Sequence, residues 1–129
     1  SIRKILEQML LAIQTKNSQS DSTVLDAMRN YIYKNYSTDM TLNDMANALG
    51  ISAKYCSNLF KKLSNDTFKN FLNRYRIDQA KKILEENPDM KIAELSEQVG
   101  FNSSNTFIRV FGKYTGMTPG AYSAAVHNK

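Results

Sequence analysis

The sequence predicts an all-α fold with two helix-turn-helix subdomains joined by a long central helix, about seven helices in all, plus an extra N-terminal helix. Apolar residues recur at helical spacing along most of the 129 residues. Only two prolines and five glycines are present, too few for a β architecture with many tight turns. In addition, a pattern of roughly thirty residues occurs twice, which indicates a paired module.

The first expected element is a helix over residues 2–16, where apolar side chains recur every three or four positions. Residues 17–22 are all polar and predict a linker. We therefore treat residues 1–22 as an N-terminal helix and linker, and residues 23–129 as the main domain. The next helix is expected over residues 23–36, with an inward stripe formed by Val24, Leu25, Met28, Tyr31 and Ile32.

Capping residues mark the two helices that follow. Thr41 is a suitable N-cap for a short helix, and Gly50 is a suitable residue to end it. Ser52 is then expected to cap a helix over residues 53–63.

A long helix is predicted over residues 68–86, because Pro88 disfavours helical backbone in the residue before it. A short helix follows over residues 92–99, and Ser103 is expected to cap another that runs to residue 114. The pair Thr118-Pro119 places proline at the first helical position and opens a terminal helix.

The chain repeats itself. Residues 42–51 recur fifty positions later as residues 92–101, with the apolar residues, a small residue and a glycine in the same places. One residue is added in the turn, and residues 52–71 then recur at an offset of fifty-one as residues 103–122. Two copies are fewer than the three or so that a solenoid needs, so a paired module fits better.

Each copy has the outline of a helix-turn-helix: a short helix, a tight turn with a glycine, and a second helix that begins at a serine cap. A small residue, Ala46 or Ser96, lets the two helices cross closely, and the glycine accepts the backbone angles of the turn. The second helix would project from the body and enter a major groove. We therefore predict sequence-specific binding of double-stranded DNA for transcription regulation, with two recognition helices in successive major grooves.

The charge distribution supports a nucleic-acid partner. The net charge is +5, and residues 52–82 carry eight basic and two acidic side chains. Residues 83–97 carry five acidic and one basic, whereas residues 98–129 carry three basic and none acidic. The two basic segments suit contact with phosphates, and the acidic one is expected to form a face turned away from the DNA.

Apolar stripes separate the inward from the outward positions of the two recognition helices. Among the outward residues, Asn58 and Asn105 can pair with adenine through two hydrogen bonds, while Lys54 and Arg109 can donate to guanine. Ser57 is a weaker candidate for base contact. Four lysines are expected to meet phosphates, which position a protein without reading sequence: Lys61, Lys62, Lys69 and Lys113.

These residues lie within stretches that resemble the AraC/XylS family of bacterial transcription regulators. The resemblance is carried by residues 55–62 and 116–122, with residues 99–101 and 109–111 between them, and it covers about residues 24–125. It implies a fold of seven helices with the following base-reading positions: Lys54, Ser57, Asn58, Asn105, Thr106 and Arg109.

The sequence departs from the family pattern at three positions. Asn65 stands where a glycine is usual after the first recognition helix, and asparagine tolerates left-handed backbone angles better than most residues. Gly112 replaces a usual lysine, which removes one phosphate contact. Ser123 replaces a common arginine, so the last helix is expected to be anchored differently.

The resemblance also implies partners. Because family members often carry the DNA-binding domain at the C-terminus, residues 2–16 are expected to be the tail of an upstream sensor or receiver domain, as in two-component response regulators. A dimerising helix or a helix packed on its own body are the alternatives. RNA polymerase is a further expected partner. No membrane contact is expected, and the single cysteine suits the reducing cytoplasm, where the protein would associate with the nucleoid.

No enzyme activity, cofactor or metal is predicted. His127 is the only histidine and is expected to be disordered near the chain end. Cys56 matches Phe107 across the repeat, so it is expected in the core and not as a nucleophile. The aromatic residues lie at core spacing, which argues against an RNA-stacking platform. The alternative function is a helical protein-interaction module without sequence-specific DNA binding.

Overall fold

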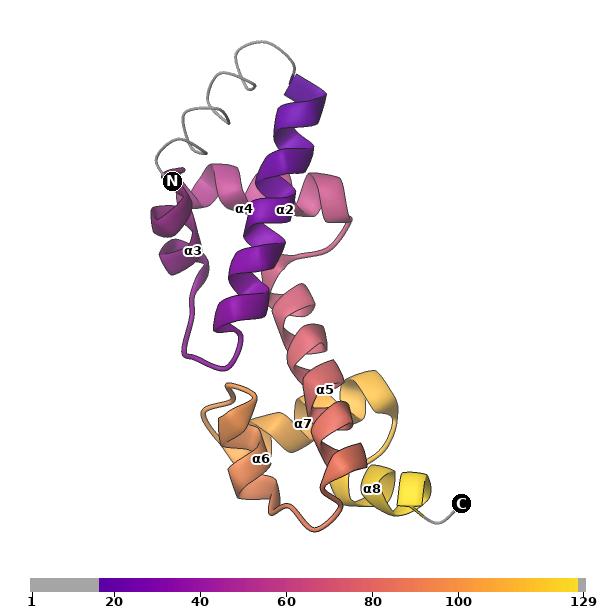
Figure 1. The fold of residues 1–129 in the computed structure, drawn as a ribbon. Coiled ribbons are helices and arrows are strands. Elements are labelled where there is room, and N and C mark those ends of the chain that lie inside the picture. Colours follow the sequence, from indigo (N-terminus) through magenta and orange to yellow (C-terminus); the bar gives the residue numbers. More distant parts are fainter. Residues whose placement is uncertain (1–16, 128–129) are drawn as a thin grey trace. The chain divides into compact units, whose positions relative to one another are not determined.

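The computed structural model describes residues 17–127, and all regular structure within that range is helical (Figure 1). This confirms the all-α prediction. The predicted bounds of every helix after the first described one agree with the structure to within about one residue. The described helices are α2 (Asn17–Asn35), α3 (Leu42–Leu49), α4 (Ala53–Ser64), α5 (Phe68–Glu86), α6 (Ile92–Gln98), α7 (Ser104–Thr115) and α8 (Pro119–His127).

The prediction of a linker over residues 17–22 is wrong, because α2 begins at Asn17 and includes this stretch. Polar residues have lower helix propensity than alanine, but none of these six is a proline or a glycine, so nothing in them stops a helix. The helix predicted over residues 2–16 lies outside the described residues.

Within the described range the helices form two compact units. Unit 1 comprises residues 17–35 and 40–68, and unit 2 comprises residues 36–39 and 69–127. Each unit therefore contains one of the two predicted helix-turn-helix pairs, α3 with α4 in unit 1 and α6 with α7 in unit 2.

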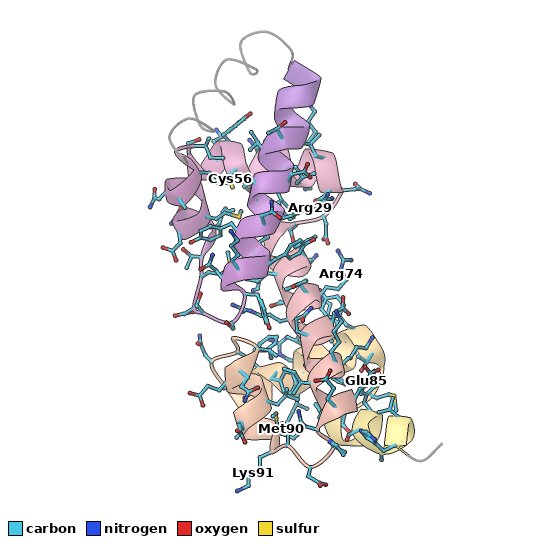
Figure 2. The ribbon with its side chains drawn as sticks, in the orientation of Figure 1. Arg29, Cys56, Arg74, Glu85, Met90 and Lys91 are labelled. Carbon is cyan, nitrogen blue, oxygen red and sulfur yellow. The ribbon has the colours of Figure 1, made fainter. Side chains whose placement is uncertain are left out.

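Unit 1 is built on α2, which packs against both α3 and α4. Four residues of the predicted inward stripe of α2, Val24, Leu25, Met28 and Ile32, are buried as expected, whereas Tyr31 is half-buried. Cys56, which is labelled in Figure 2, is completely buried, and its thiol donates a hydrogen bond to the Met28 sulfur at 3.3 Å. The rest of this core is apolar and consists of Met40, Met45, Ala46, Leu59 and Phe60.

Unit 2 has its own core between α5, α6 and α7. Three aromatic rings follow one another through it, with centroid distances of 5.4 Å for Phe101–Phe107 and 5.7 Å for Phe107–Phe111. Such tilted and edge-to-face contacts add to the hydrophobic stabilisation of a core. The aliphatic part of the cluster consists of Ile77, Ala80, Leu84, Leu95, Val99 and Val110.

Helix α8 is held to the end of α5 and to the loop after it. The Tyr122 hydroxyl donates to Glu85 at 3.0 Å, and the Ser123 hydroxyl donates to the Pro88 carbonyl at 3.3 Å. The His127 Nε2 atom lies 2.9 Å from the Leu84 carbonyl oxygen. The expected disorder of His127 is therefore wrong, because helix formation and this contact place its ring.

Candidate nucleic-acid interface

The helix-turn-helix of unit 1 is fixed by its caps. The Thr41 hydroxyl accepts from the Asp44 backbone N–H at 3.1 Å, and the Asp44 carboxylate accepts from the Thr41 N–H at 3.0 Å, which completes a capping box. Gly50 ends α3 in the left-handed region at φ +72°. The Ser52 hydroxyl then accepts from the Tyr55 N–H at 3.1 Å and starts α4.

The turn of unit 2 repeats the same hydrogen bonds. The Phe101 N–H donates to the Ser96 carbonyl at 2.9 Å, as the Ile51 N–H donates to the Ala46 carbonyl at 3.0 Å in unit 1. The Ser103 hydroxyl accepts from the backbone N–H three residues on, again at 3.1 Å. The repeat predicted from sequence is thus a repeat of backbone geometry.

The two recognition helices also end alike. Asn65 has φ +56° and ψ +32°, and Gly116 has φ +75° and ψ +8°, so both are left-handed C-caps. Just before each cap, a hydroxyl donates back to the carbonyl four residues earlier, from Ser64 to Phe60 and from Thr115 to Phe111. Asparagine therefore fills the usual place of glycine in the same backbone conformation.

Helix α4 presents the predicted base-reading residues of unit 1 to solvent. Lys54, Ser57 and Asn58 are exposed, while Cys56 and Leu59 on the opposite face are buried. The buried face fixes the rotation of the helix about its axis, so the exposed residues form one strip.

Helix α7 does the same in unit 2, with one difference. Asn105 and Arg109 are exposed, but Thr106 is half-buried, and its Oγ1 accepts a hydrogen bond from the Ser103 hydroxyl at 2.9 Å. Ile108, which sequence reasoning did not select, lies between them in the sequence and is also exposed.

The four predicted phosphate-contacting lysines are all exposed. Lys61 and Lys62 lie in the last turn of α4, and Lys113 lies in the last turn of α7. Positive charge at these places also interacts favourably with the negative end of the helix dipole. The Lys113 ammonium is 5.6 Å from the centroid of the Tyr114 ring. Lys69 lies in the first turn of α5.

Arg76 does not belong to this surface, although it lies in the basic segment, residues 52–82, that is expected to face DNA. Its side chain is buried, and it donates to the Tyr36 carbonyl at 2.8 Å and to the Thr38 carbonyl at 2.9 Å. Its guanidinium lies 5.5 Å from the centroid of the Phe101 ring. Burial lowers the pKa of Arg76, and the nearby Asp39 carboxylate partly opposes this. Arg76 therefore supports the turn of the second helix-turn-helix.

A sequence signal for Arg76 exists in hindsight. It lies four residues after Leu72 and four before Ala80, both of which are buried, so it falls on the inward stripe of α5. A long cationic side chain on such a stripe satisfies its donors with backbone carbonyls instead of water.

Burial raises the pKa of the Cys56 thiol to about 11, which keeps it protonated and unreactive. No group of three or more potential metal ligands occurs within residues 17–127. No helix in that range is long and apolar enough to cross a membrane.

Comparisons with known proteins agree with this geometry. The family described as "Helix-turn-helix domain" matches residues 45–125. An uncharacterized HTH-type transcriptional regulator of Escherichia coli K12, YijO, is 33% identical over 120 residues, which cover 93% of this chain and 42% of the relative. The chain thus spans less than half the length of that relative.

Two solved structures are similar to this chain in both fold and sequence. The C-terminal domain of the two-component response regulator yesN from Fusobacterium nucleatum has a TM-score of 0.72 and 34% identity, covering 76% of this chain and 95% of that one. The C-terminal domain of AraT, a response regulator from Geobacillus stearothermophilus, has a TM-score of 0.76 and 29% identity, covering 79% and 84%.

Proposed function

The chain belongs to the AraC-type helix-turn-helix family of DNA-binding transcription regulators, and from this premise we propose how it reads DNA. Helices α4 and α7 each enter a major groove, and their exposed strips contact the bases. The observation that carries this proposal is the repeated turn, which ends each pair in a capped helix with one buried and one polar face. The chain is a regulatory protein and not an enzyme.

Three residues on each helix contact base edges in this proposal. Asn58 and Asn105 pair with adenine through its N6 and N7 atoms, and Lys54 and Arg109 donate to guanine O6 and N7. The remaining two residues, Ser57 and Thr106, offer hydroxyl groups. Thr106 Oγ1 accepts from Ser103 and keeps its own hydrogen for an acceptor on a base.

Four lysines hold the DNA backbone and make binding depend on salt. If Lys61, Lys62, Lys69 and Lys113 each neutralise one phosphate, the slope of log affinity against log salt concentration has a contribution of about −3.6 from them. This component is the same for every sequence and positions the two recognition helices.

One chain reads an asymmetric site with two elements centred about 10 base pairs apart, in successive major grooves.

We propose that this domain is part of a longer regulator. The yesN and AraT domains are the C-terminal parts of response regulators, and YijO is more than twice as long as the matched region. We propose that an upstream sensor or receiver domain controls DNA binding, that RNA polymerase is the partner at the promoter, and that the protein acts on the nucleoid in the bacterial cytoplasm.

A selection experiment tests the proposed function. The purified chain is used to enrich duplexes from a library with a random central region, and its affinity for the enriched duplex is compared with that for a shuffled one across a range of salt concentrations. We expect a defined sequence bound roughly a thousandfold more tightly than the shuffled duplex. Equal affinity for both would refute sequence-specific recognition, and absence of DNA binding would favour a protein-interaction module.

A further inference from the structure

Ile108 is an aliphatic side chain on the recognition face of α7. It is three residues after Asn105 and directly before Arg109, a spacing that places all three on one face of the helix. Its side chain is 38% exposed. The other exposed large hydrophobic residues within the described range are Tyr33 and Tyr55, and both carry a hydroxyl group. Of these three exposed residues, Ile108 is therefore the one whose side chain has no polar atom.

Neither packing nor helix formation accounts for an isoleucine at this position. The buried face of α7 is supplied by Phe107, Val110 and Phe111, which enter the core of unit 2. A β-branched residue also has lower helix propensity than alanine or the long polar residues. Single exposed apolar residues are ordinary on protein surfaces, so the position of Ile108 carries the argument and not its exposure alone.

The internal repeat defines that position. The offset of fifty-one that relates the caps Ser52 and Ser103 also relates the helix ends Asn65 and Gly116, so the register holds along the whole of both recognition helices. At this offset Ile108 is the counterpart of Ser57. The same side of each helix thus carries a hydroxyl in unit 1 and a branched hydrocarbon in unit 2.

The major groove offers one apolar group to such a side chain. Guanine, cytosine and adenine present hydrogen-bond donors and acceptors there, whereas thymine also presents its 5-methyl group. We propose that Ile108 determines specificity by contacting the 5-methyl group of a thymine, next to the bases that Asn105 and Arg109 contact. This inference rests on the proposed entry of α7 into a major groove and adds a residue and a base to it.

The test uses the duplex enriched by the purified wild-type chain. The element read by α7 is identified as the one whose base preference relaxes in Arg109→Ala. Each thymine in that element is then replaced singly by deoxyuridine, which removes only the methyl group. For the wild type, affinity should fall about two- to fivefold at one thymine, as expected for the loss of one buried methyl.

Variants at position 108 show whether the methyl contact is made by this side chain. Ile108→Ala should bind the thymine and deoxyuridine duplexes equally, whereas Ile108→Val, which keeps a branched hydrocarbon, should still distinguish them. Ile108→Ser copies the residue at the equivalent place in α4, and selection with it should lose the thymine while keeping the rest of the site. Only small shifts in the melting curves are expected for all three, because Ile108 lies outside the core of unit 2.

The outcomes separate this inference from the function on which it rests. If the α7 element contains no thymine, or if deoxyuridine weakens the wild type and Ile108→Ala equally, the assignment of Ile108 is overturned while sequence-specific binding stands. If the wild type enriches no sequence, the proposed function fails, and the assignment fails with it.

Discussion

Gly100 lies so close to Arg76 that a Cβ atom on Gly100 would be 2.8 Å from the Arg76 Nε atom. The same Cβ would overlap the carbonyl oxygen of Tyr36, which accepts a hydrogen bond from that Nε. Gly100 also has φ +93°, a conformation that L side chains rarely adopt. The turn of the second helix-turn-helix is therefore restricted both by its own backbone and by the buried arginine against it.

Gly100→Ala should destabilise the protein by roughly 2–5 kcal/mol, because the strain of a positive φ adds to the overlap with backbone and guanidinium. Gly50→Ala is the matched control, since Gly50 has φ +72° but no atom within 4 Å of its Cβ position. It should cost only about 1 kcal/mol. Urea unfolding of both variants measures the difference. Equal losses would show that the contact with Arg76 and Tyr36 does not restrict position 100.

Asn65→Gly should leave stability nearly unchanged, while Asn65→Val should lower it by about 1–2 kcal/mol. Asn65 has φ +56°, and a β-branched side chain resists the left-handed region that glycine adopts freely. Thermal unfolding followed by circular dichroism compares the two variants with the wild type. Identical melting temperatures for glycine and valine would contradict the role of Asn65 as a left-handed helix cap.

Raising the pH from 8 to 10 should cost the wild type about 1 kcal/mol more than Cys56→Ala. Burial raises the pKa of this thiol from 9.0 to about 11, so between these values the unfolded chain releases a proton that the folded chain retains. The stabilising contribution of the protonated thiol is therefore present below pH 9 and is lost as the pH rises toward 11. Guanidinium unfolding at both pH values tests this. Lysine and tyrosine titrate in both proteins, so comparison with Cys56→Ala removes their contribution. If the stability of the two proteins changes equally between pH 8 and pH 10, the role of the thiol is refuted.

Arg109→Ala should weaken binding to the enriched site by about 1–3 kcal/mol and relax base preference in one element. Lys61→Ala should weaken binding to all duplexes alike and reduce the salt slope by about one. Both side chains are exposed, so neither change should affect folding. Fluorescence anisotropy with the enriched and shuffled duplexes separates the two effects. If Arg109→Ala weakens both duplexes equally, Arg109 is not a base reader.

Inserting 5 base pairs between the two elements should strongly reduce affinity. The insertion turns the second element to the opposite face of the duplex, where a protein that binds both elements at once cannot reach it. Insertion of 10 base pairs is the control: it returns the second element to its original face of the duplex but doubles the distance between the two elements. Gel-shift titration of the three duplexes measures the loss. Undiminished affinity for the 5-base-pair insertion would mean that only one recognition helix reads DNA, or that the two read independently.

The helix bounds were predictable because local hydrogen bonds determine them. Thr41, Ser52 and Ser103 each accept from a backbone N–H three residues later, a relationship visible in any short stretch of sequence. Asn65 was identified through the repeat, which aligned it with Gly116. The caps are local and the repeat is visible in the linear sequence, so the fold class and both helix-turn-helix units could be predicted.

Features that depend on contacts between distant residues could not be predicted from the sequence. The spacing from Leu72 and Ala80 places Arg76 on the inward stripe of α5, but its acceptors lie in a loop forty and thirty-eight positions away, and no local pattern identifies them. His127 was misjudged for the same reason, because its contact is with Leu84. Hydrogen-bonding capacity, which is the criterion for the candidate base readers, does not select Ile108, although the repeat aligns it with Ser57.

Residues 36–39 connect α2 to α3, yet they belong to unit 2. The polypeptide therefore passes between the two units at three places, after residues 35, 39 and 68. A fragment that starts at Lys69 would contain α6, α7 and α8, but it would leave the buried Arg76 guanidinium without its two carbonyl acceptors. The two units are thus not two domains joined by a single linker, and no single cleavage of this chain releases both of them whole.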